Sequence, residues 1–451
     1  MRPNSHRAGR KLTLLPLVAA TFFMVSGGPY AIEDILGGAG LLRAAAILLI
    51  LPLFWSLPTA LMIGELASAI PEDGGFYIWV RRAMGPFWGY QEIWLSLSAS
   101  IFDMAIYPAF AVAYLTRLAQ MSGIDWFTAS WHRYACSLAI VAICCAWNFR
   151  GATAVGHGSL WMSLAILAPF AVLVALGFWH GFAVHTSATS PSISGGSLST
   201  AILVAMWNYM GWDNASTVAQ EVENPQRTYP RAMIASIVVV ALSYVLPLAA
   251  LAAAHVSTAN FATGAWVNAA ASLGGPTLGW CVAVGGVLTG IGMFNALVMS
   301  YSRLPMAMAE DGLLPRILAR RNARGVPWVA VLACGAAWAL ALNLNFERLI
   351  TIDLVLYGGS LLLEFVALVI LRRREPQLPR PFRAGSFATA CSLGIGPAVL
   401  IGYALWVSRT DQMMLGNSTV PALAFAAAIA LLGPLFYAIP TLLRPRQNKG
   451  Q

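Results

Sequence analysis

Charged residues are scarce in this chain of 451 residues: Asp, Glu, Lys and Arg make up 10% of it, whereas 59% is hydrophobic. A soluble globular protein carries about 25% charged residues, so the chain has too few charges to cover a surface that faces water. The composition therefore excludes a soluble fold and predicts an all-α, polytopic membrane protein. The net charge of +9 then needs no nucleic-acid partner to explain it.

Signatures of catalysis and of covalent assembly are also missing. The chain has no HExxH, no GxSxG and no clustered His/Cys ligand set, so we expect no enzyme, metal site or cofactor. No long polar segment exists to relay a signal, which disfavours a membrane sensor or scaffold. The six cysteines lie inside or at the edge of apolar runs, so we expect no structural disulfide and no disulfide-linked subunit.

Long apolar runs are abundant, and a bilayer-spanning helix needs about 20 such residues. Hydrophobic windows predict twelve spans at 12–40, 41–65, 86–116, 134–150, 155–180, 198–221, 232–254, 277–304, 326–345, 351–371, 390–408 and 419–443. All but five of the 27 Lys and Arg residues then fall on one side of the membrane. The positive-inside rule places that side, with both termini, in the cytoplasm of a cell whose plasma (inner) membrane holds the chain.

Two of these spans contain helix-breaking sequence. Residues 26–30 read Ser-Gly-Gly-Pro-Tyr, and residues 207–213 read Trp-Asn-Tyr-Met-Gly-Trp-Asp. Backbone groups freed by glycine and proline are costly in hydrocarbon unless they line a cavity or meet a ligand. Breaks in the first and sixth spans predict a transporter with an inverted repeat and a site at the midplane. The alternative is a simple proline kink and a packing glycine.

Several runs resemble a known transporter superfamily. They include SGGPYAIED (26–34), LPLFWSLPTALMIGELASAIPEDGGFYIWV (51–80), GPFWGYQE (85–92), FDMAIYP (102–108), GWDNASTVAQEVENPQRTYPRAM (211–233), SRLPMAMAEDGLLP (302–315), LLLEFVALVILRRREP (361–376) and RPFR (380–383). The chain resembles the amino acid–polyamine–organocation superfamily, and within it the plant-type polyamine uptake transporters of the branch related to L-type amino acid transporters.

The resemblance implies a single transporter domain over residues 1–451 that imports its substrate with protons. It implies a 5+5 inverted repeat, with the first five helices in 12–180 and the second five in 198–371, followed by two C-terminal helices in 390–443. Amino acid transporters of the superfamily hold a substrate carboxylate on backbone N–H groups of the first break. Here Gly27 and Gly28 offer donors, but Pro29 has none, which favours a substrate without a carboxylate.

Acidic residues inside the spans favour a cationic substrate. Glu33 follows the first break, Asp103 lies in the middle of the third span, and Asp213 ends the second break. Intramembrane acids are functional candidates, and several around one cavity repel each other unless amines or protons compensate. Tyr107 shares the helical face of Asp103. The alternatives are helix capping for Glu33 and Asp213 and an interhelical hydrogen bond for Asp103.

Aromatic residues beside the breaks complete the predicted site. A cation over an aromatic ring gains about 0.5–2 kcal/mol, so we expect Tyr30, Trp207, Tyr209 and Trp212 to contact substrate; the alternative is ordinary packing. The two lysines, Lys11 and Lys449, are terminal. The lysine that replaces a sodium ion in some proton-coupled relatives is therefore absent from the fifth span.

Proton coupling then requires a carboxylate. The candidates are Asp103, Glu33, Asp213 and Glu364, while Glu65 and Glu92 are expected to pair with arginines. The prediction is a proton symporter that imports polyamines or related organic cations. The alternative is an amino-acid permease or exchanger, coupled to protons or, through Thr289 and Asn295, to sodium.

Overall fold

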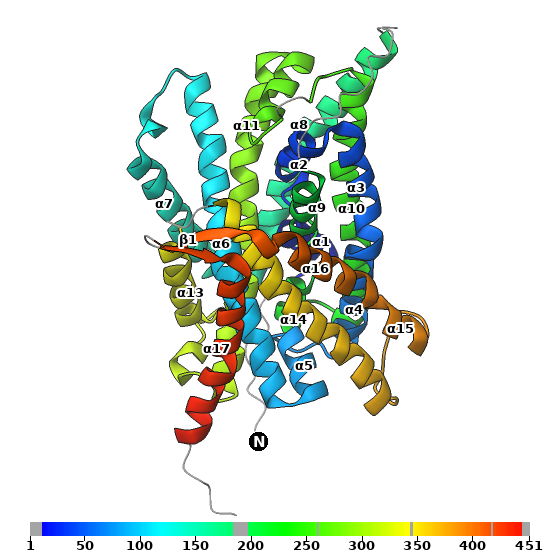
Figure 1. Ribbon diagram of the computed structural model, residues 1–451, viewed down its shortest axis with the longest axis vertical. Helices are drawn as coiled ribbons and strands as arrows, with labels where there is room; N and C mark the ends of the chain where they lie inside the picture. The colour runs from blue at the N-terminus through cyan, green and yellow to red at the C-terminus, as the bar shows by residue number, and fades with distance from the viewer. Residues whose placement is uncertain (1–10, 184–196, 259–260, 343–345, 416–417, 444–451) are drawn as a thin grey trace, which may run out of the picture.

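The computed structural model describes residues 11–183, 197–258, 261–342, 346–415 and 418–443. These residues form mostly α-helices, many of which run along the long axis of the molecule (Figure 1). Within the described part of the chain, eight helical segments are long and apolar enough to cross a membrane. The chain is therefore a multi-pass helical membrane protein.

The helices of the N-terminal half alternate between long rods and short broken pieces. They are α1 (Leu14–Val25), η1 (Gly28–Ile32), α2 (Glu33–Ala39), α3 (Leu41–Phe54), α4 (Ser56–Ala69), α5 (Phe76–Met84), α6 (Pro86–Met121), η2 (Trp126–Thr128), α7 (Ser130–Asn148) and α8 (Ala152–Ala183). Pro86 begins α6 at the position where a helix tolerates proline, because the missing N–H would have no partner there.

The C-terminal half adds a small hairpin to the helices. Its elements are α9 (Leu198–Trp207), η3 (Asp213–Glu221), α10 (Pro225–Ala253), α11 (Ala265–Tyr301), α12 (Arg303–Glu310), η4 (Arg316–Ala319), α13 (Trp328–Ala341), α14 (Phe346–Arg374), α15 (Phe387–Leu393), α16 (Ile395–Val407), η5 (Ser408–Thr410), β1 (Gln412–Leu415), β2 (Ser418–Pro421) and α17 (Ala422–Leu443). Strands β1 and β2 pair antiparallel, with Met413 opposite Val420.

Three helix ends differ from the predicted boundaries of the spans. The eighth span was expected to begin at residue 277, but α11 begins at Ala265 and bends at Gly275, whose φ of +78° interrupts the helix before Pro276. The seventh was expected from 232, but α10 begins at Pro225. The twelfth was expected from 419, where β2 lies instead. In the first two cases the hydrophobic window is shorter than the helix, because a helix that continues beyond the bilayer is no longer uniformly apolar.

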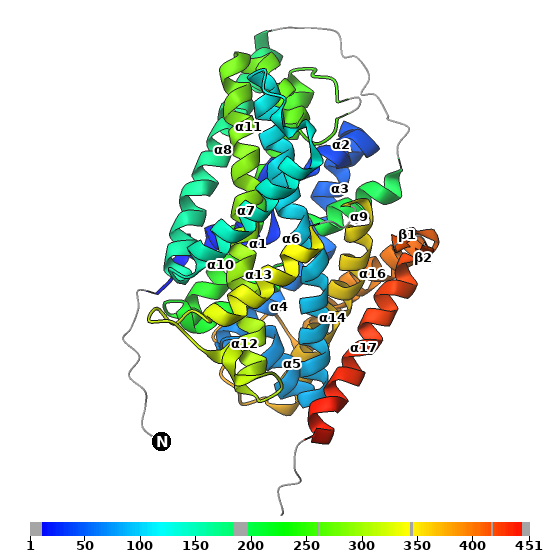
Figure 2. The same cartoon turned by 90° about the vertical axis from the view of Figure 1, so that its left-hand side faces the viewer.

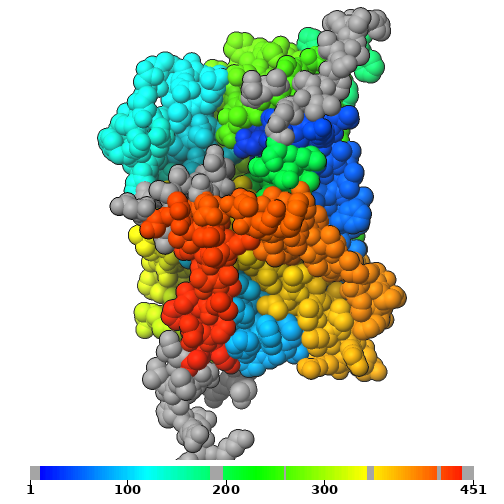
Figure 3. Space-filling view, viewed as in Figure 1, coloured from blue at the N-terminus to red at the C-terminus, as the bar shows by residue number. Residues whose placement is uncertain are grey.

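The centre of the molecule is built from α1, α6, α11 and α14. Helix α6 packs against both α11 and α14, and α11 also packs against α1 and α8. Short helices α5 and α12 lie at one end of the molecule and α2 lies at the other (Figure 2). The C-terminal elements α15, α16 and α17 extend across one outer face (Figure 3), which leaves the interior to the earlier helices.

Candidate functional site

The helix breaks occur where glycine and proline interrupt the two apolar runs. Helix α1 ends at Val25, Ser26 is extended, and Gly28 has a φ of +67°, a conformation that side chains other than glycine rarely adopt. The Gly28 N–H donates to Ser26 Oγ at 2.9 Å. Helix α9 ends at Trp207, and the helical path resumes at Asp213 as the 3-10 helix η3.

The two broken segments contact each other directly. Asn208 donates from Nδ2 to the carbonyl oxygen of Ala31 at 3.0 Å. Gly211 has a φ of +87°, and a Cβ on it would lie 2.4 Å from the carbonyl oxygen of Met24. Glycine is therefore required here both by conformation and by the close approach of the two backbones.

A small cavity lies beside this contact. Its lining residues come from α1, α6, α11, α14 and the second break: Met24, Val25, Asp103, Tyr107, Trp207, Met210, Gly211, Asn214, Tyr301 and Tyr357. Only about 10 Å³ is open to the centre of a water molecule, which is room for about one water. The cavity is thus closed around four aromatic side chains and one carboxylate.

Asp103 provides the single carboxylate among these lining residues. Its Oδ1 accepts hydrogen bonds from Tyr107 Oη at 2.5 Å and from Trp207 Nε1 at 3.2 Å. The rings of Tyr107 and Trp207 stack, with centroids 6.0 Å apart and planes 19° from parallel. Both donors bind Oδ1, and the hydrogen bonds formed by the described residues leave Oδ2 for a ligand. Asp103, Tyr107 and Trp207 therefore form one unit, although Trp207 is distant in sequence.

Gly27, Gly28 and Tyr30 do not line the cavity. Gly27 packs on α11, where its carbonyl oxygen accepts from Thr289 Oγ1 at 3.3 Å. The Tyr30 hydroxyl donates to the carbonyl oxygen of Val282 at 2.9 Å. These residues of the first break face neighbouring helices rather than the space beside Asp103.

Glu33 caps a helix at a distance from the cavity. Its carboxylate accepts from the backbone N–H groups of Gly264 and Trp266 at 2.9 and 2.8 Å, and from Tyr114 Oη at 2.7 Å. Gly264 and Trp266 stand at the beginning of α11. Free N–H groups at a helix N-terminus favour a carboxylate beside them, and Glu33 also stands in the first turn of α2, which is where the helix-capping alternative places it.

Three predicted residues of the second break also lie outside the lining. Tyr209 donates to the carbonyl oxygen of Leu48 at 2.8 Å and therefore points toward α3. Trp212 is fully buried, and its indole N–H has no hydrogen-bond partner among the described residues. Asp213 is buried and reaches the cavity only indirectly, because its Oδ1 accepts from Tyr357 Oη at 2.6 Å.

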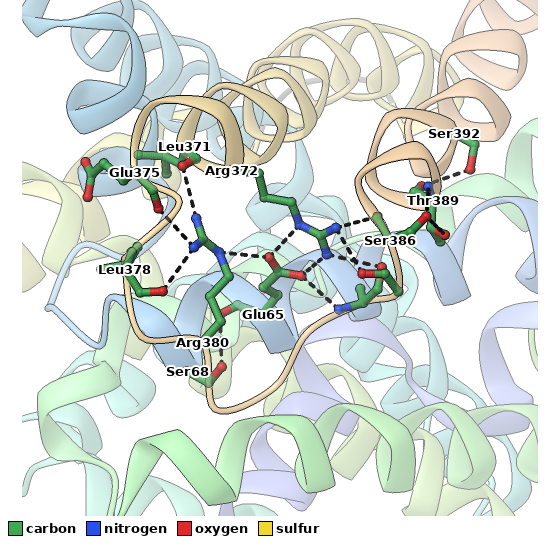
Figure 4. Close-up of polar contacts among 12 residues, drawn as sticks. Glu65, Ser68, Leu371, Arg372, Glu375, Leu378, Arg380, Ser386, Thr389 and Ser392 are labelled. Carbon is green, nitrogen blue, oxygen red and sulfur yellow. Dashed lines mark hydrogen bonds and ion pairs between the residues drawn. The ribbon is translucent and has the colours of Figure 1, made fainter.

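The expectation for Glu65 is confirmed, and that for Glu92 is wrong. Glu65 is fully buried and forms ion pairs with Arg372 and, at 3.2 Å, with Arg380, as Figure 4 shows. Glu92 is equally buried but accepts from Ser96 Oγ at 3.0 Å and contacts no arginine in the described part of the chain. The arginines just before α6 in the chain pair with other acids, Arg81 with Asp311 and Arg82 with Glu375.

Sequence reasoning also missed lining residues and one buried acid. Tyr301, Tyr357 and Asn214 line the cavity beside Asp103. Asp353 on α14 is 1% exposed, interacts electrostatically with Asp103, and has an oxygen without a partner among the described residues. Asp353 is one of two acids in the tenth predicted span, with Glu364, and an acid inside a span was the signal that pointed to it.

Comparison with known proteins assigns the family. A family model described as amino acid permease matches residues 15–439. The chain is 33% identical to polyamine transporter RMV1 of Arabidopsis thaliana over 87% of this chain and 80% of that protein. It is 32% identical to polyamine transporter PUT1 of Oryza sativa over 93% and 79%, and 27% identical to the serine/threonine exchanger SteT of Bacillus subtilis over 82% and 84%. With the family model spanning most of its length and transporters as relatives, the chain belongs to the amino acid permease family and is a membrane transporter, not an enzyme.

Proposed function

We propose that the chain imports polyamines or related organic cations together with protons, by alternating access. Its architecture is proposed as twelve membrane-spanning segments in one transporter domain. Residues 12–180 and 198–371 form the two five-helix inverted repeats, with α1 and α9 as the first halves of their discontinuous helices, and residues 390–443 supply two further helices. The two polyamine transporters among the relatives support the substrate class.

The observation that carries the proposal is the position of Asp103. A carboxylate in a closed cavity, beside stacked Tyr107 and Trp207 rings and with one oxygen unoccupied, matches the chemistry of an amine. The carboxylate supplies charge and hydrogen bonds, and the rings attract a cation and pack against its methylene groups. A neutral or anionic substrate would leave Asp103 uncompensated.

The small volume of the cavity supports alternating access. Space for about one water does not admit a diamine, so the closed arrangement must open toward one side before substrate enters. Gly211 of the second broken segment lies against Met24 of the first, and both residues line the cavity. A movement of either repeat would therefore change the shape of the cavity. The distribution of arginines supports both termini in the cytoplasm and a location in the plasma membrane.

Ligand stabilisation tests the substrate class. Purified protein should melt at a higher temperature with putrescine or spermidine, because a ligand at 100 times its Kd stabilises the folded state by about 2.7 kcal/mol. Asp103→Asn should abolish this shift and amine uptake while the protein still folds. The matched control is Asp125→Asn, an exposed acid in the segment before η2, which should behave as wild type. Unchanged uptake by Asp103→Asn would remove Asp103 from the site.

Amino-acid exchange is the second candidate, and similarity to the exchanger SteT favours it. In that case neutral amino acids should raise the melting temperature and amines should not. Transport in proteoliposomes separates the two candidates further. Accumulation driven by a pH gradient supports proton symport, whereas accumulation driven by a sodium gradient alone contradicts it.

A further inference from the structure

Helices α6 and α14 carry the same polar pattern in opposite order. Helix α6 has Glu92, then Ser96, then Asp103, and α14 has Asp353, then Ser360, then Glu364. In each helix the two acids are 11 positions apart and the serine is four positions from the glutamate. Eleven residues make about three helical turns, so the acids of each helix lie on one face.

A contact between the serines sets the register of the two helices. Ser96 Oγ and Ser360 Oγ are 2.9 Å apart in a buried hydrogen bond, and α6 packs along α14. Because the helices run antiparallel, this contact places Glu92 opposite Glu364 and Asp103 opposite Asp353. The electrostatic interactions within each pair agree with that register.

The two glutamates are buried without enough donors to be ionised together. Both are 0% exposed, and neither oxygen of Glu364 has a hydrogen-bond partner among the described residues. Glu92 accepts from Ser96 on one oxygen, and its other oxygen has no partner. Two carboxylates that share such a place repel each other, and protonation of one removes the repulsion and supplies a hydrogen-bond donor.

No cation compensates the pair in the described part of the chain. The titratable groups that face it are Asp213 on η3, Tyr357 on α14 and Tyr77 on α5. Asp213 adds a negative charge when it is ionised and so increases the demand for a proton, and the two phenols supply no positive charge. Asp213 interacts with the glutamates and also with Asp353, and thus connects the glutamates to the cavity.

We propose that Glu92 and Glu364 together form a proton-binding site, separate from the substrate carboxylate Asp103, that carries the coupling proton. The inference rests on the proposed function, since it names the proton site of that transport cycle. One proton is held between the two carboxylates and is released to water at the end of the molecule where α6 begins and α14 ends. No other bond is made or broken.

The separation of the two acid pairs explains how proton and amine are bound together without competing. About 11 residues of helix separate the pairs, roughly 16 Å, so an amine at Asp103 does not displace the proton from Glu364. The amine and the proton nevertheless each lower the negative charge along the interface between α6 and α14. Binding of both lowers this charge more than binding of either one, and this favours the closed arrangement over the open ones.

Separate measurements of binding, exchange and accumulation test the proposal. Glu92→Gln and Glu364→Gln should each keep the thermal stabilisation by amines. Each should also keep the exchange of internal for external amine across the membrane of preloaded vesicles, because exchange needs no net proton movement. Accumulation driven by a pH gradient should fall by about tenfold or more, and the proton influx followed with a trapped dye should fall with it. The exposed Glu72→Gln is the matched control and should retain accumulation.

Each outcome decides the proposal. Loss of coupling with retained exchange in either variant supports it, and the double variant should then add little. Accumulation at the level of the Glu72→Gln control would overturn it, as would equal loss of exchange and accumulation in variants that still bind amine. Failure of wild type to bind any amine would instead contradict the proposed function, so the two failures are distinguishable.

Discussion

The two ends of the molecule are held closed by different kinds of interaction. Every ion pair formed by the described residues lies at the arginine-rich end, which we define by Arg81, Arg82 and residues 303–324 and 372–383. At the opposite end, the buried Glu33 carboxylate is held by backbone N–H groups and a tyrosine instead.

This difference has a physical consequence for opening. Ion pairs between long side chains can separate and rehydrate, and their strength depends on burial and salt. Two of the contacts of Glu33 are made by backbone N–H groups at the N-terminus of α11 and the third by Tyr114 on α6, so the backbone contacts are lost when the first segment of α11 moves away from Glu33. We therefore expect the arginine-rich end to open through side-chain separation and the other end through displacement of helix segments.

Among the changes that test this difference between the ends, removal of the Glu65 carboxylate should cause the largest loss of stability. Glu65 is 0% exposed and joins α4 to Arg372 and Arg380, whose side chains are only 2% and 8% exposed. Glu65→Gln leaves two buried guanidinium groups without an anion, so we expect a loss of about 3–5 kcal/mol in stability. Denaturation of the purified variant measures it.

The control for Glu65 is an exposed pair at the same end. Glu310→Gln removes the partner of Arg321, in a pair whose side chains are 48% and 35% exposed, and should change stability by less than about 1 kcal/mol. If both variants lost the same amount of stability, burial would not be what makes the Glu65 ion pairs the strongest interaction at this end.

Glu33→Gln should give a smaller loss at the opposite end. The amide oxygen still accepts from one backbone N–H of Gly264 or Trp266, but the charge that favours the N-terminus of α11 is gone. We expect a loss of about 1–3 kcal/mol and faster amide hydrogen exchange at the first turn of α11. Wild-type exchange rates there would show that Glu33 does not hold the helix.

A further effect at the arginine-rich end is a pH dependence at Asp73, in the segment between α4 and α5. Burial, with Glu221 nearby, raises the pKa of Asp73 to about 6 from an ordinary value of 3.8. Since the folded pKa is the higher one, the folded state binds the proton more tightly, and stability falls as pH rises from about 4 to 6 and stays lower above it.

Asp73→Asn should remove that dependence. The variant should match wild type near pH 4 and exceed it by up to about 3 kcal/mol at pH 7, as measured by melting at both values. An equal difference at the two values would assign the effect to the lost contact with Arg321, 4.0 Å away, rather than to titration.

The arginine-rich end was more readily predicted than the central site. Glu65 was expected to pair with arginines because it stands near the cytoplasmic end of its predicted span, where the arginines gather, although its partners Arg372 and Arg380 are distant in the sequence. Asp103, Tyr107 and Trp207 were also named for the site. Closeness to a helix break was the reason for naming Tyr30, Glu33, Tyr209 and Asp213. Their side chains nevertheless point away from the cavity.

The amino-acid sequence by itself determined that the chain is a membrane protein, which stretches are helical, and where two helices break. Hydrophobicity, glycine and proline act over a few residues, so these features can be read locally. Which side chains face the cavity was decided by the tertiary structure. Successive residues of a helix point about 100° apart, so a residue next to the break in sequence can point away from the cavity. The pairing of Glu92 with Glu364, on helices far apart in the chain, depends on a register that only packing sets.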